Sequence, residues 1–361
     1  LIEASDGLLY GTTVQGGLSQ NGTVFRLKRD GSGYQILWRF LGSPLDGSKP
    51  YGGLLETADG SLYGTTAYGG GPGLGTIFRM DKDGSGYAIL RGFGKPPDAA
   101  SPYSGLIAGS DGFLYGSSPY GGKDDIGSVF RLRSDNTGFG VLHSFKETDG
   151  KHAFARLIEG PGGALYGTTA LGGAADKGTL FKINKDGTGW GVIHDFTGTD
   201  DGDGARPSAN ASLVFGGDGA LYGTTYFGGV ADAGTIFQLG EAGYGVVYSF
   251  PGEAGIGANP YAGLVKGADG ALYGTTLNSG LTCGTVFRFA PNASLLISTN
   301  GQLTLTGPPK HRFRIQVRDD IGSFSAWRFL TNVTLVTDRF TFSVPVQGAG
   351  QSRFYRAELV P

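Results

Sequence analysis

Cysteine is almost absent from this chain, which has 361 residues, four histidines and the single Cys283. One thiol cannot close an internal disulfide bond, and one cysteine with four histidines is a poor set of metal ligands. No run of 18 apolar residues occurs, so no segment predicts a membrane-spanning helix. No signal peptide opens the sequence, although it starts within a repeat and an upstream segment could have been removed.

An excess of charge of one sign is also missing, because the net charge is −2 and both signs are mixed along the chain. The lack of a basic stripe argues against a nucleic-acid partner, and the lack of a polybasic segment argues against a charged membrane surface. No Gly-x-Ser-x-Gly, His-Glu-x-x-His or phosphate-loop motif occurs. Helical periodicity of apolar residues is missing too, which predicts an all-β protein.

Glycine is the residue that the chain has in excess, with 69 of 361 positions, nearly three times the usual share of about 7%. No Gly-X-Y period exists, which excludes collagen. The hydrophobic fraction of 39% is too high for a disordered glycine-rich polymer. The glycines are therefore expected in turns and closely packed strands of a folded β protein.

One short motif, Leu-Tyr-Gly-Thr-Thr, returns through most of the chain, with Ser117-Ser118 replacing the two threonines in its third copy. The interval between copies runs from 51 residues (Tyr115 to Tyr166) to 56 residues (Tyr166 to Tyr222). A fixed period of this size indicates an array of one supersecondary unit. The tyrosines that mark the six copies are Tyr10, Tyr63, Tyr115, Tyr166, Tyr222 and Tyr273.

Each repeat is expected to contain four short antiparallel strands joined by tight turns such as Asp83-Gly84-Ser85-Gly86. Four strands repeated six times predict a six-bladed β-propeller over residues 1–292. The sixth repeat stops at Phe289, before its fourth strand. That strand is expected either from upstream of Leu1 or from Ser294–Thr299, because an open edge invites aggregation.

The glycine inside the repeated motif lies in the middle of a predicted strand, where glycine costs roughly 0.5–1 kcal/mol relative to alanine. We expect a neighbouring blade or an aromatic ring to approach this glycine too closely for a Cβ atom. Residues 293–361 lose the repeat and alternate as strands. They predict a small C-terminal β-sandwich, whose many arginines are interpreted as a solvated face.

The repeat pattern is Asp-Gly-x-Leu-Tyr-Gly-Thr-Thr, then Gly-Gly, then Gly-Thr-Val-Phe-Arg. It resembles the secreted β-propeller repeat named after Gloeobacter and Verrucomicrobia, and the resemblance covers residues 1–292. The fourth repeat departs at Pro161-Gly162-Gly163, where the aspartate is lost. The tail, with Trp327 and its Arg353 to Arg356 end, resembles the C-terminal sandwich of secreted proteins from that bacterial group. The resemblance implies export and a propeller fold, and it brings no catalytic residues.

The loops after each motif and the linkers between repeats are expected to share one face of the propeller, where function usually lies. Aromatic residues recur in both kinds of loop and predict an arc around one mouth of the disc. Such an arc suits stacking against sugars, because aromatic faces bury a large apolar area. The alternative is that the rings fill gaps between blades. The candidate ligand-binding residues are Tyr51, Tyr68, Tyr103, Tyr120, Phe154, Phe227 and Tyr261.

His152 and Arg156 stand where sister linkers have proline-tyrosine and glycine. With a nearby tyrosine they could serve as base and charge neutraliser in polysaccharide β-elimination, which makes them candidate catalytic residues. His143 and His194 share one strand position with Trp38, Arg91 and Tyr248. A position that accepts all five is interpreted as exposed or at an edge.

The longest linker contains Asp200, Asp201 and Asp203, and clustered carboxylates suit a structural Ca²⁺. The spacing does not continue to an EF-hand glutamate, so a solvated acidic loop is the alternative.

The sequence leaves three functions open. The first is a secreted or cell-surface binding protein for polysaccharide or another extracellular ligand. The second is a polysaccharide lyase or glycoside hydrolase on the same face. The third is a structural protein that self-associates by strand exchange.

Overall fold

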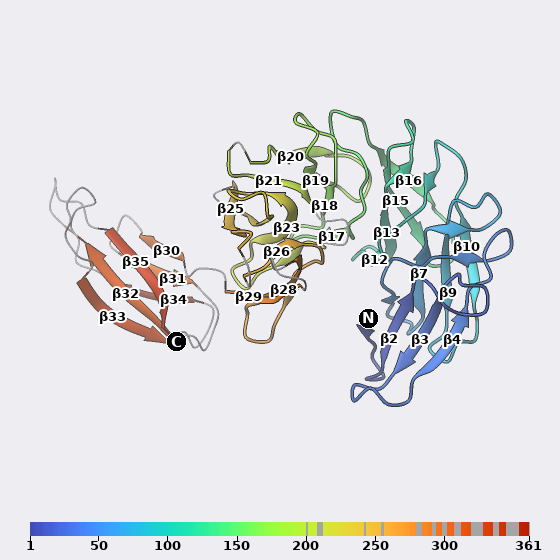
Figure 1. Cartoon of the computed structure of the whole chain (residues 1–361), viewed down its shortest axis with the longest axis horizontal. Coiled ribbons are helices and arrows are strands. Elements are labelled where there is room, and N and C mark those ends of the chain that lie inside the picture. The colour runs from blue at the N-terminus through green and yellow to red at the C-terminus, as the bar shows by residue number, and fades with distance from the viewer. Residues whose placement is uncertain are drawn as a thin grey trace.

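The computed structural model describes residues 1–199, 201–207, 212–241, 243–253, 256–278 and 284–290, and the six strands of the tail. These residues form an all-β protein without a helix, and no helix capable of crossing a bilayer occurs among them. Six antiparallel sheets, five with four strands and one with five, follow one another in chain order around an arc (Figure 1). The predicted six-bladed β-propeller is confirmed.

The first three blades each have four strands in sequence order, from a two-residue inner strand to an outer strand. Blade one consists of β1 (Ile2–Glu3), β2 (Leu9–Thr13), β3 (Thr23–Leu27) and β4 (Gln35–Arg39). Blade two consists of β6 (Leu55–Glu56), β7 (Leu62–Thr66), β9 (Thr76–Met80) and β10 (Ala88–Gly92). Blade three consists of β12 (Ile107–Ala108), β13 (Phe113–Ser118), β15 (Ser128–Arg133) and β16 (Gly140–Ser144).

The next three blades repeat this order. Blade four consists of β17 (Ile158–Glu159), β18 (Leu165–Thr169), β19 (Thr179–Ile183) and β20 (Gly191–Asp195). Blade five consists of β22 (Val214–Phe215), β23 (Leu221–Gly228), β24 (Thr235–Gly240) and β25 (Gly243–Ser249). Blade six consists of β27 (Val265–Lys266), β28 (Leu272–Asn278) and β29 (Val286–Phe289).

No fourth strand pairs with β29 among the described residues. The tail strand β30 (Ser294–Ile297), one of the two expected sources, pairs instead with β31 (Gln302–Thr306). The described residues thus show β30 paired within the tail and not with β29, while the other expected source, upstream of Leu1, stays a prediction. Val286 in β29 is 79% exposed.

The tail strands form two three-stranded antiparallel sheets, which fits the predicted change of architecture after blade six. Their packing into a sandwich stays a prediction, and Trp327 lies outside the described residues. The first sheet has the order β30, β31 and β34 (Arg339–Ser343). The second has the order β33 (Arg328–Thr334), β32 (Arg312–Arg318) and β35 (Phe354–Val360).

The repeated motif forms the second strand of every blade, and its glycine lies opposite the phenylalanine of the third strand. Gly64 pairs with Phe78 across β7 and β9, and a Cβ atom on Gly64 would lie 2.4 Å from Cζ of Phe78. The equivalent close approach occurs at Gly116 and Phe130. The expectation that an aromatic ring requires this glycine is confirmed.

The hydroxyl groups of the motif tie each strand to its neighbours. Thr66 shares a hydrogen bond of 2.8 Å with Thr76, which holds β7 to β9, while Thr65 donates to the carbonyl of Ser104 in the next linker. In blade three Ser118 and Ser128 replace both members of the first pair and keep the bond, at 2.9 Å. The departure at the third copy of the motif is therefore a matched exchange.

The hydrophobic core lies between blades. One cluster combines Tyr10, Val24 and Phe40 of blade one with Leu54 and Phe78 of blade two, all of them buried. Clusters of the same composition join the later blades. Each sheet is thus stabilised mainly by packing its face against the next sheet, which fixes the arc of loops described below.

Candidate binding face

The linkers and the loops after the repeated motif lie on one face, as expected, because they pair with each other. The linker strand β5 (Gly47–Ser48) pairs with β8 (Tyr68–Gly69), and β11 (Ala99–Ala100) pairs with β14 (Tyr120–Gly121). Later linkers place β21 (Gly204–Pro207) on β23 and β26 (Ala258–Pro260) on β28. Residues 51, 68, 103 and 120 are therefore brought to a common surface.

The linker backbone takes the same turn in blade after blade. A residue with positive φ stands two positions before each aromatic, as at Lys49 (φ 57°), Ser101 (φ 51°) and His152 (φ 59°). The N–H of His152 donates to the carbonyl of Ile126 in the preceding blade, as that of Ser101 donates to Leu74. The backbone conformation at His152 is thus shared by the linkers, and only its histidine side chain differs from the residues at the same position in the other linkers.

Five of the predicted ligand-binding residues form one contiguous group with His152. Tyr103 stands at its centre: its ring stacks on Tyr51 at 4.6 Å between centroids and meets the edge of Phe154 at 5.4 Å. Its hydroxyl lies 2.7 Å from that of Tyr68. We call this set the first aromatic group, and its members are Tyr51, Tyr68, Tyr103, Tyr120, His152 and Phe154.

The first aromatic group keeps much of its surface in solvent, because Tyr51, Tyr68 and Tyr120 are 40–45% exposed. Burial, together with the hydrogen bond to Tyr68, raises the pKa of Tyr103 well above its usual range. Its hydroxyl therefore stays protonated at neutral pH and can donate a hydrogen bond. Flat rings with polar tips at this exposure are suited to hold a sugar or another flat polar ligand.

His152 is oriented by one hydrogen bond. Its Nδ1 lies 2.9 Å from the carbonyl oxygen of Pro119, and a carbonyl can only accept, so Nδ1 carries the proton. In the neutral imidazole Nε2 is then an acceptor. The ring meets Tyr120 at 5.4 Å and Phe154 at 6.1 Å between centroids.

Phe227 and Tyr261 lie apart from the first group. Both gather around Tyr226, which meets Phe227 at 4.5 Å and Tyr261 at 5.9 Å between ring centroids. The sequence analysis missed Tyr226, although it directly follows the fifth copy of the motif. The predicted arc is thus two groups, the second formed by Tyr226, Phe227 and Tyr261.

His143 and His194 have a structural role that the sequence analysis misread. The predicted edge position is confirmed, because β16 and β20 are edge strands of their sheets, but both side chains are half-buried rather than exposed. His194 stacks on Tyr244 of the next blade at 3.4 Å between centroids, and its Nε2 lies 2.8 Å from Oδ2 of Asp203. His143 stacks in the same way on Trp190.

Asp203, a candidate calcium ligand, accepts hydrogen bonds from several groups of the fold. Its Oδ2 faces His194 and the N–H of Thr197, and its Oδ1 faces the N–H of Gly204 and the hydroxyl of Tyr244. Burial alone would raise its pKa, but these hydrogen bonds outweigh burial and lower it. Asp200 lies outside the described residues, so calcium binding there stays a prediction.

The same junction recurs between other blades. A flat side chain on the fourth strand stacks on an aromatic residue of the next blade and donates to an aspartate of the linker. Trp38 stacks on Tyr87 at 3.7 Å between centroids and bonds Asp46 at 3.2 Å. We call these contacts the junction stacks; a bulge in each fourth strand accompanies them.

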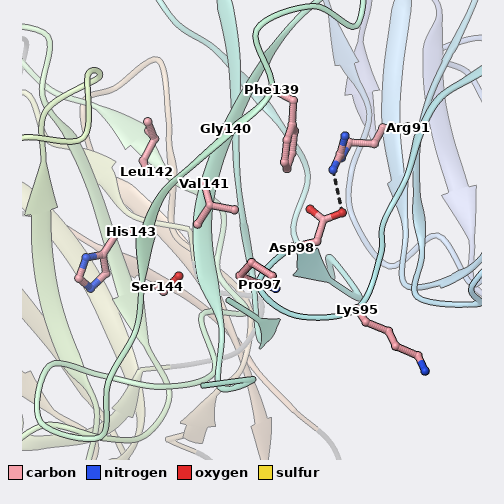
Figure 2. Close-up of a pocket in the computed structure, with 10 residues that line it drawn as sticks. All are labelled: Arg91, Lys95, Pro97, Asp98, Phe139, Gly140, Val141, Leu142, His143 and Ser144. Atoms are coloured by element: carbon pink, nitrogen blue, oxygen red, sulfur yellow. Dashed lines mark hydrogen bonds and ion pairs between the residues drawn. The ribbon is translucent and has the colours of Figure 1, made fainter. Parts of the chain in front are cut away.

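The junction stack between blades two and three is different. Arg91 lies over Phe139, 3.4 Å from the ring centroid, and pairs with Asp98 at 2.7 Å. A hollow of about 710 Å³ opens beside them, and Figure 2 shows Arg91 next to Phe139 and paired with Asp98. The charge of Arg91 is already neutralised by Asp98, which makes this hollow a weaker candidate site than the aromatic face.

The chain was compared with curated proteins and with solved structures. No curated protein matches the chain in sequence. Among solved structures, a nidogen/laminin complex matches at 14% identity, covering 83% of this chain and 89% of the other, with a TM-score of 0.45. A putative 6-phosphogluconolactonase from Bacteroides uniformis matches at 13% identity, covering 92% and 99%, with a TM-score of 0.47. A putative gluconolactonase matches at 16% identity, covering 71% and 85%, with a TM-score of 0.41.

The model of one family matches the chain twice, over residues 1–162 and 127–312, and its description is the Gloeobacter/Verrucomicrobia repeat. These two ranges include all six copies of the Leu-Tyr-Gly-Thr-Thr motif and the blades built on them. The chain therefore belongs to the Gloeobacter/Verrucomicrobia repeat family.

Proposed function

We propose that this protein is an extracellular or cell-surface module that binds polysaccharide through the first aromatic group. The observation that supports this is the contiguous set of half-exposed rings around Tyr103, which come from three successive linkers and the loops between them. Sugar rings stack on such aromatic faces, while the tyrosine hydroxyls supply hydrogen bonds. Several neighbouring platforms suit a polymer better than a single sugar.

The proposal is tested by affinity electrophoresis of the purified protein in gels that contain plant, algal or bacterial polysaccharides. The wild type is expected to be retarded in at least one gel, and the triple variant Tyr68→Ala, Tyr103→Ala, Tyr120→Ala is expected to run as in an empty gel. Tyr248→Ala serves as the control, because Tyr248 is 38% exposed on the outer strand β25 and is not a member of the first aromatic group. Equal retardation of the triple variant would remove the aromatic face from consideration.

Catalysis on the same face is the second candidate, and the orientation of His152 favours it. With Nδ1 protonated by its bond to Pro119, the neutral ring offers Nε2 as a base. New reducing or unsaturated ends in the polysaccharide incubations would identify an enzyme. A His152→Ala variant that still forms such ends at the full rate would refute the assignment of His152.

Self-association is the third candidate, and the exposure of Val286 in β29 favours it. An exposed apolar residue on a strand can pack against a strand of a second copy. Light scattering should then show oligomers whose fraction rises with protein concentration, and Val286→Lys should lower that fraction. A monodisperse monomer over the whole concentration range would contradict this candidate.

A further inference from the structure

One position recurs directly before the buried leucine that leads into the inner strand of each blade. A Cβ atom on Gly105 would lie 2.5 Å from the carbonyl oxygen of Gly53, and one on Gly263 would lie 2.6 Å from the backbone nitrogen of Ser212. Successive blades therefore touch by their backbones at this position, next to the inner strand of each sheet. Most blades have glycine or serine at this position, and blade four alone carries a long charged side chain, Arg156.

The guanidinium of Arg156 has no partner among the residues that the structure describes. Its Nε is buried and donates no hydrogen bond, and no carboxylate of the described chain forms an ion pair with the guanidinium. Burial alone lowers the pKa of Arg156. The Nε of Arg91 is also buried without a hydrogen bond, but its Nη2 pairs with Asp98 and its guanidinium lies over Phe139, whereas Arg156 has no ion pair among the described residues.

A buried guanidinium without a counter-charge is costly, and proteins usually pair such a group or leave it in water. Sister blades avoid the cost with glycine or serine at the same position. An anion bound from outside would offset the loss of hydration, and the planar fork of arginine matches an oxyanion. The residue is therefore poised for a ligand that the chain itself does not provide.

The position of Arg156 connects it to the first aromatic group. Phe154 lies two residues before Arg156 in the same linker, so the two Cα atoms are at most about 7 Å apart. Phe154 in turn meets the edge of Tyr103 at 5.4 Å between ring centroids. A sugar that stacks on these rings can place a substituent on its own ring within reach of the long arginine side chain.

We propose that Arg156 binds an oxyanion substituent, a carboxylate or a sulfate ester, of a polysaccharide held by the first aromatic group, so that the protein selects acidic over neutral polymers. This inference rests on the proposed polysaccharide-binding function and narrows it to a charge class.

Affinity electrophoresis with three matched gels tests the selectivity: polygalacturonate, a sulfated galactan and a neutral galactan. We expect the apparent dissociation constant of the wild type to be at least tenfold lower in an acidic gel than in the neutral gel. Which acidic gel retards the protein distinguishes carboxylate from sulfate. Arg156→Gly, the residue of the sister blades, should lose the preference while its melting temperature shows that it folds. Arg156→Lys should keep only part of the preference, because the charge remains without the fork.

A second measurement keeps this inference separate from the proposed function. In nitrogen-15 spectra, the Arg156 Nε signal is assigned by its absence in Arg156→Lys, and the protein is titrated with monomeric galacturonate and with galactose. A shift with galacturonate alone supports the anion site even if no polymer is retained, in which case only polysaccharide binding fails. Equal retention in all gels by wild type and Arg156→Gly, or no galacturonate-specific shift, would overturn the role of Arg156 and leave the aromatic face intact.

Discussion

The hydroxyl oxygens of Tyr68 and Tyr103 lie 2.7 Å apart, in a hydrogen bond that joins a loop of blade two to the linker into blade three. Tyr103 also stacks on Tyr51 from the previous linker. A single ring thus connects three separate segments of the binding face. Its removal is expected to disturb the whole first aromatic group.

Tyr103→Ala is therefore expected to weaken polysaccharide retention about tenfold, equivalent to about 1.4 kcal/mol, a usual loss for a central aromatic anchor. Tyr68→Phe keeps the ring and removes only the hydroxyl, so it should cost less. Affinity electrophoresis measures both, with Tyr248→Ala as the control. A Tyr103→Ala variant that binds as the control does would place the ligand elsewhere.

Gly64→Ala should destabilise the propeller by about 1–3 kcal/mol, the usual cost of forcing extra volume into a packed core. The new Cβ atom would lie 2.4 Å from Cζ of Phe78. Urea unfolding measures the loss, and Gly92→Ala is the matched control because nothing lies within 4 Å of a Cβ atom there. Phe78→Leu should return part of the lost stability; equal effects of the two glycine variants would contradict the explanation.

Asp203→Ala should cost about 1–3 kcal/mol or more, because several buried donors lose their acceptor together. The folded-state pKa of Asp203 is lowered. Its contribution is therefore present above the unfolded pKa of about 3.9 and is lost as the pH falls through the folded value.

Urea unfolding at a series of pH values checks this sign. Asp203→Asn should reduce the loss of stability on acidification that the wild type shows below about pH 4. Asp124→Asn, at an exposed loop carboxylate, is the control. An unchanged acid profile for Asp203→Asn would show that other carboxylates determine acid sensitivity.

Arg156→Met should raise stability by about 1–4 kcal/mol, because it keeps an apolar stem and removes a buried charge without a partner. Arg39→Met, at an exposed position of β4, should have little effect. Thermal unfolding without ligand compares the two. If Arg156→Met is less stable than the wild type, the charge of Arg156 is already compensated within the free protein, and the proposed anion site is contradicted.

The buried tyrosine of the repeated motif predicts how the stability of the protein depends on alkaline pH. Burial and the hydrogen bond to Asp6 raise the pKa of Tyr10 to about 12. This contribution to stability is complete below the unfolded pKa of about 10 and is lost as the pH rises through the folded value. Tyr10→Phe should flatten the stability profile between about pH 10 and 12 relative to Tyr248→Phe. Identical slopes for the two variants would contradict the assignment.

The blades could be predicted from the sequence because the same pattern of strand and turn residues occurs in every repeat. The glycine of the motif and the phenylalanine of the third strand recur together, so their contact could be expected from the copies alone. The face that carries Tyr51 and Tyr68 followed from strand alternation. The separation of Tyr261 from Tyr103 did not follow, because it depends on distances around the ring.

The junction stacks could not be predicted, because their members are far apart in the sequence and differ from blade to blade. Trp38, Arg91 and His194 looked like evidence of a tolerant position. They share a property that a residue-type comparison hides: each is flat and carries an N–H group for the linker aspartate. The sequence did contain a signal for the linker aspartate. Three of the linker prolines are preceded by an aspartate four residues earlier, at Asp46, Asp98 and Asp203.

The junction stacks also distinguish the near-identical repeats from one another. Tryptophan meets tyrosine, arginine meets phenylalanine and histidine meets tryptophan or tyrosine, in an order that follows the chain. A folding intermediate that skipped a blade would bring Trp38 against Phe139 and leave Tyr87 unmatched. Variation at these sites therefore gives each border between blades its own pair of residues, and we expect a duplicated blade to meet unmatched partners at both of its borders.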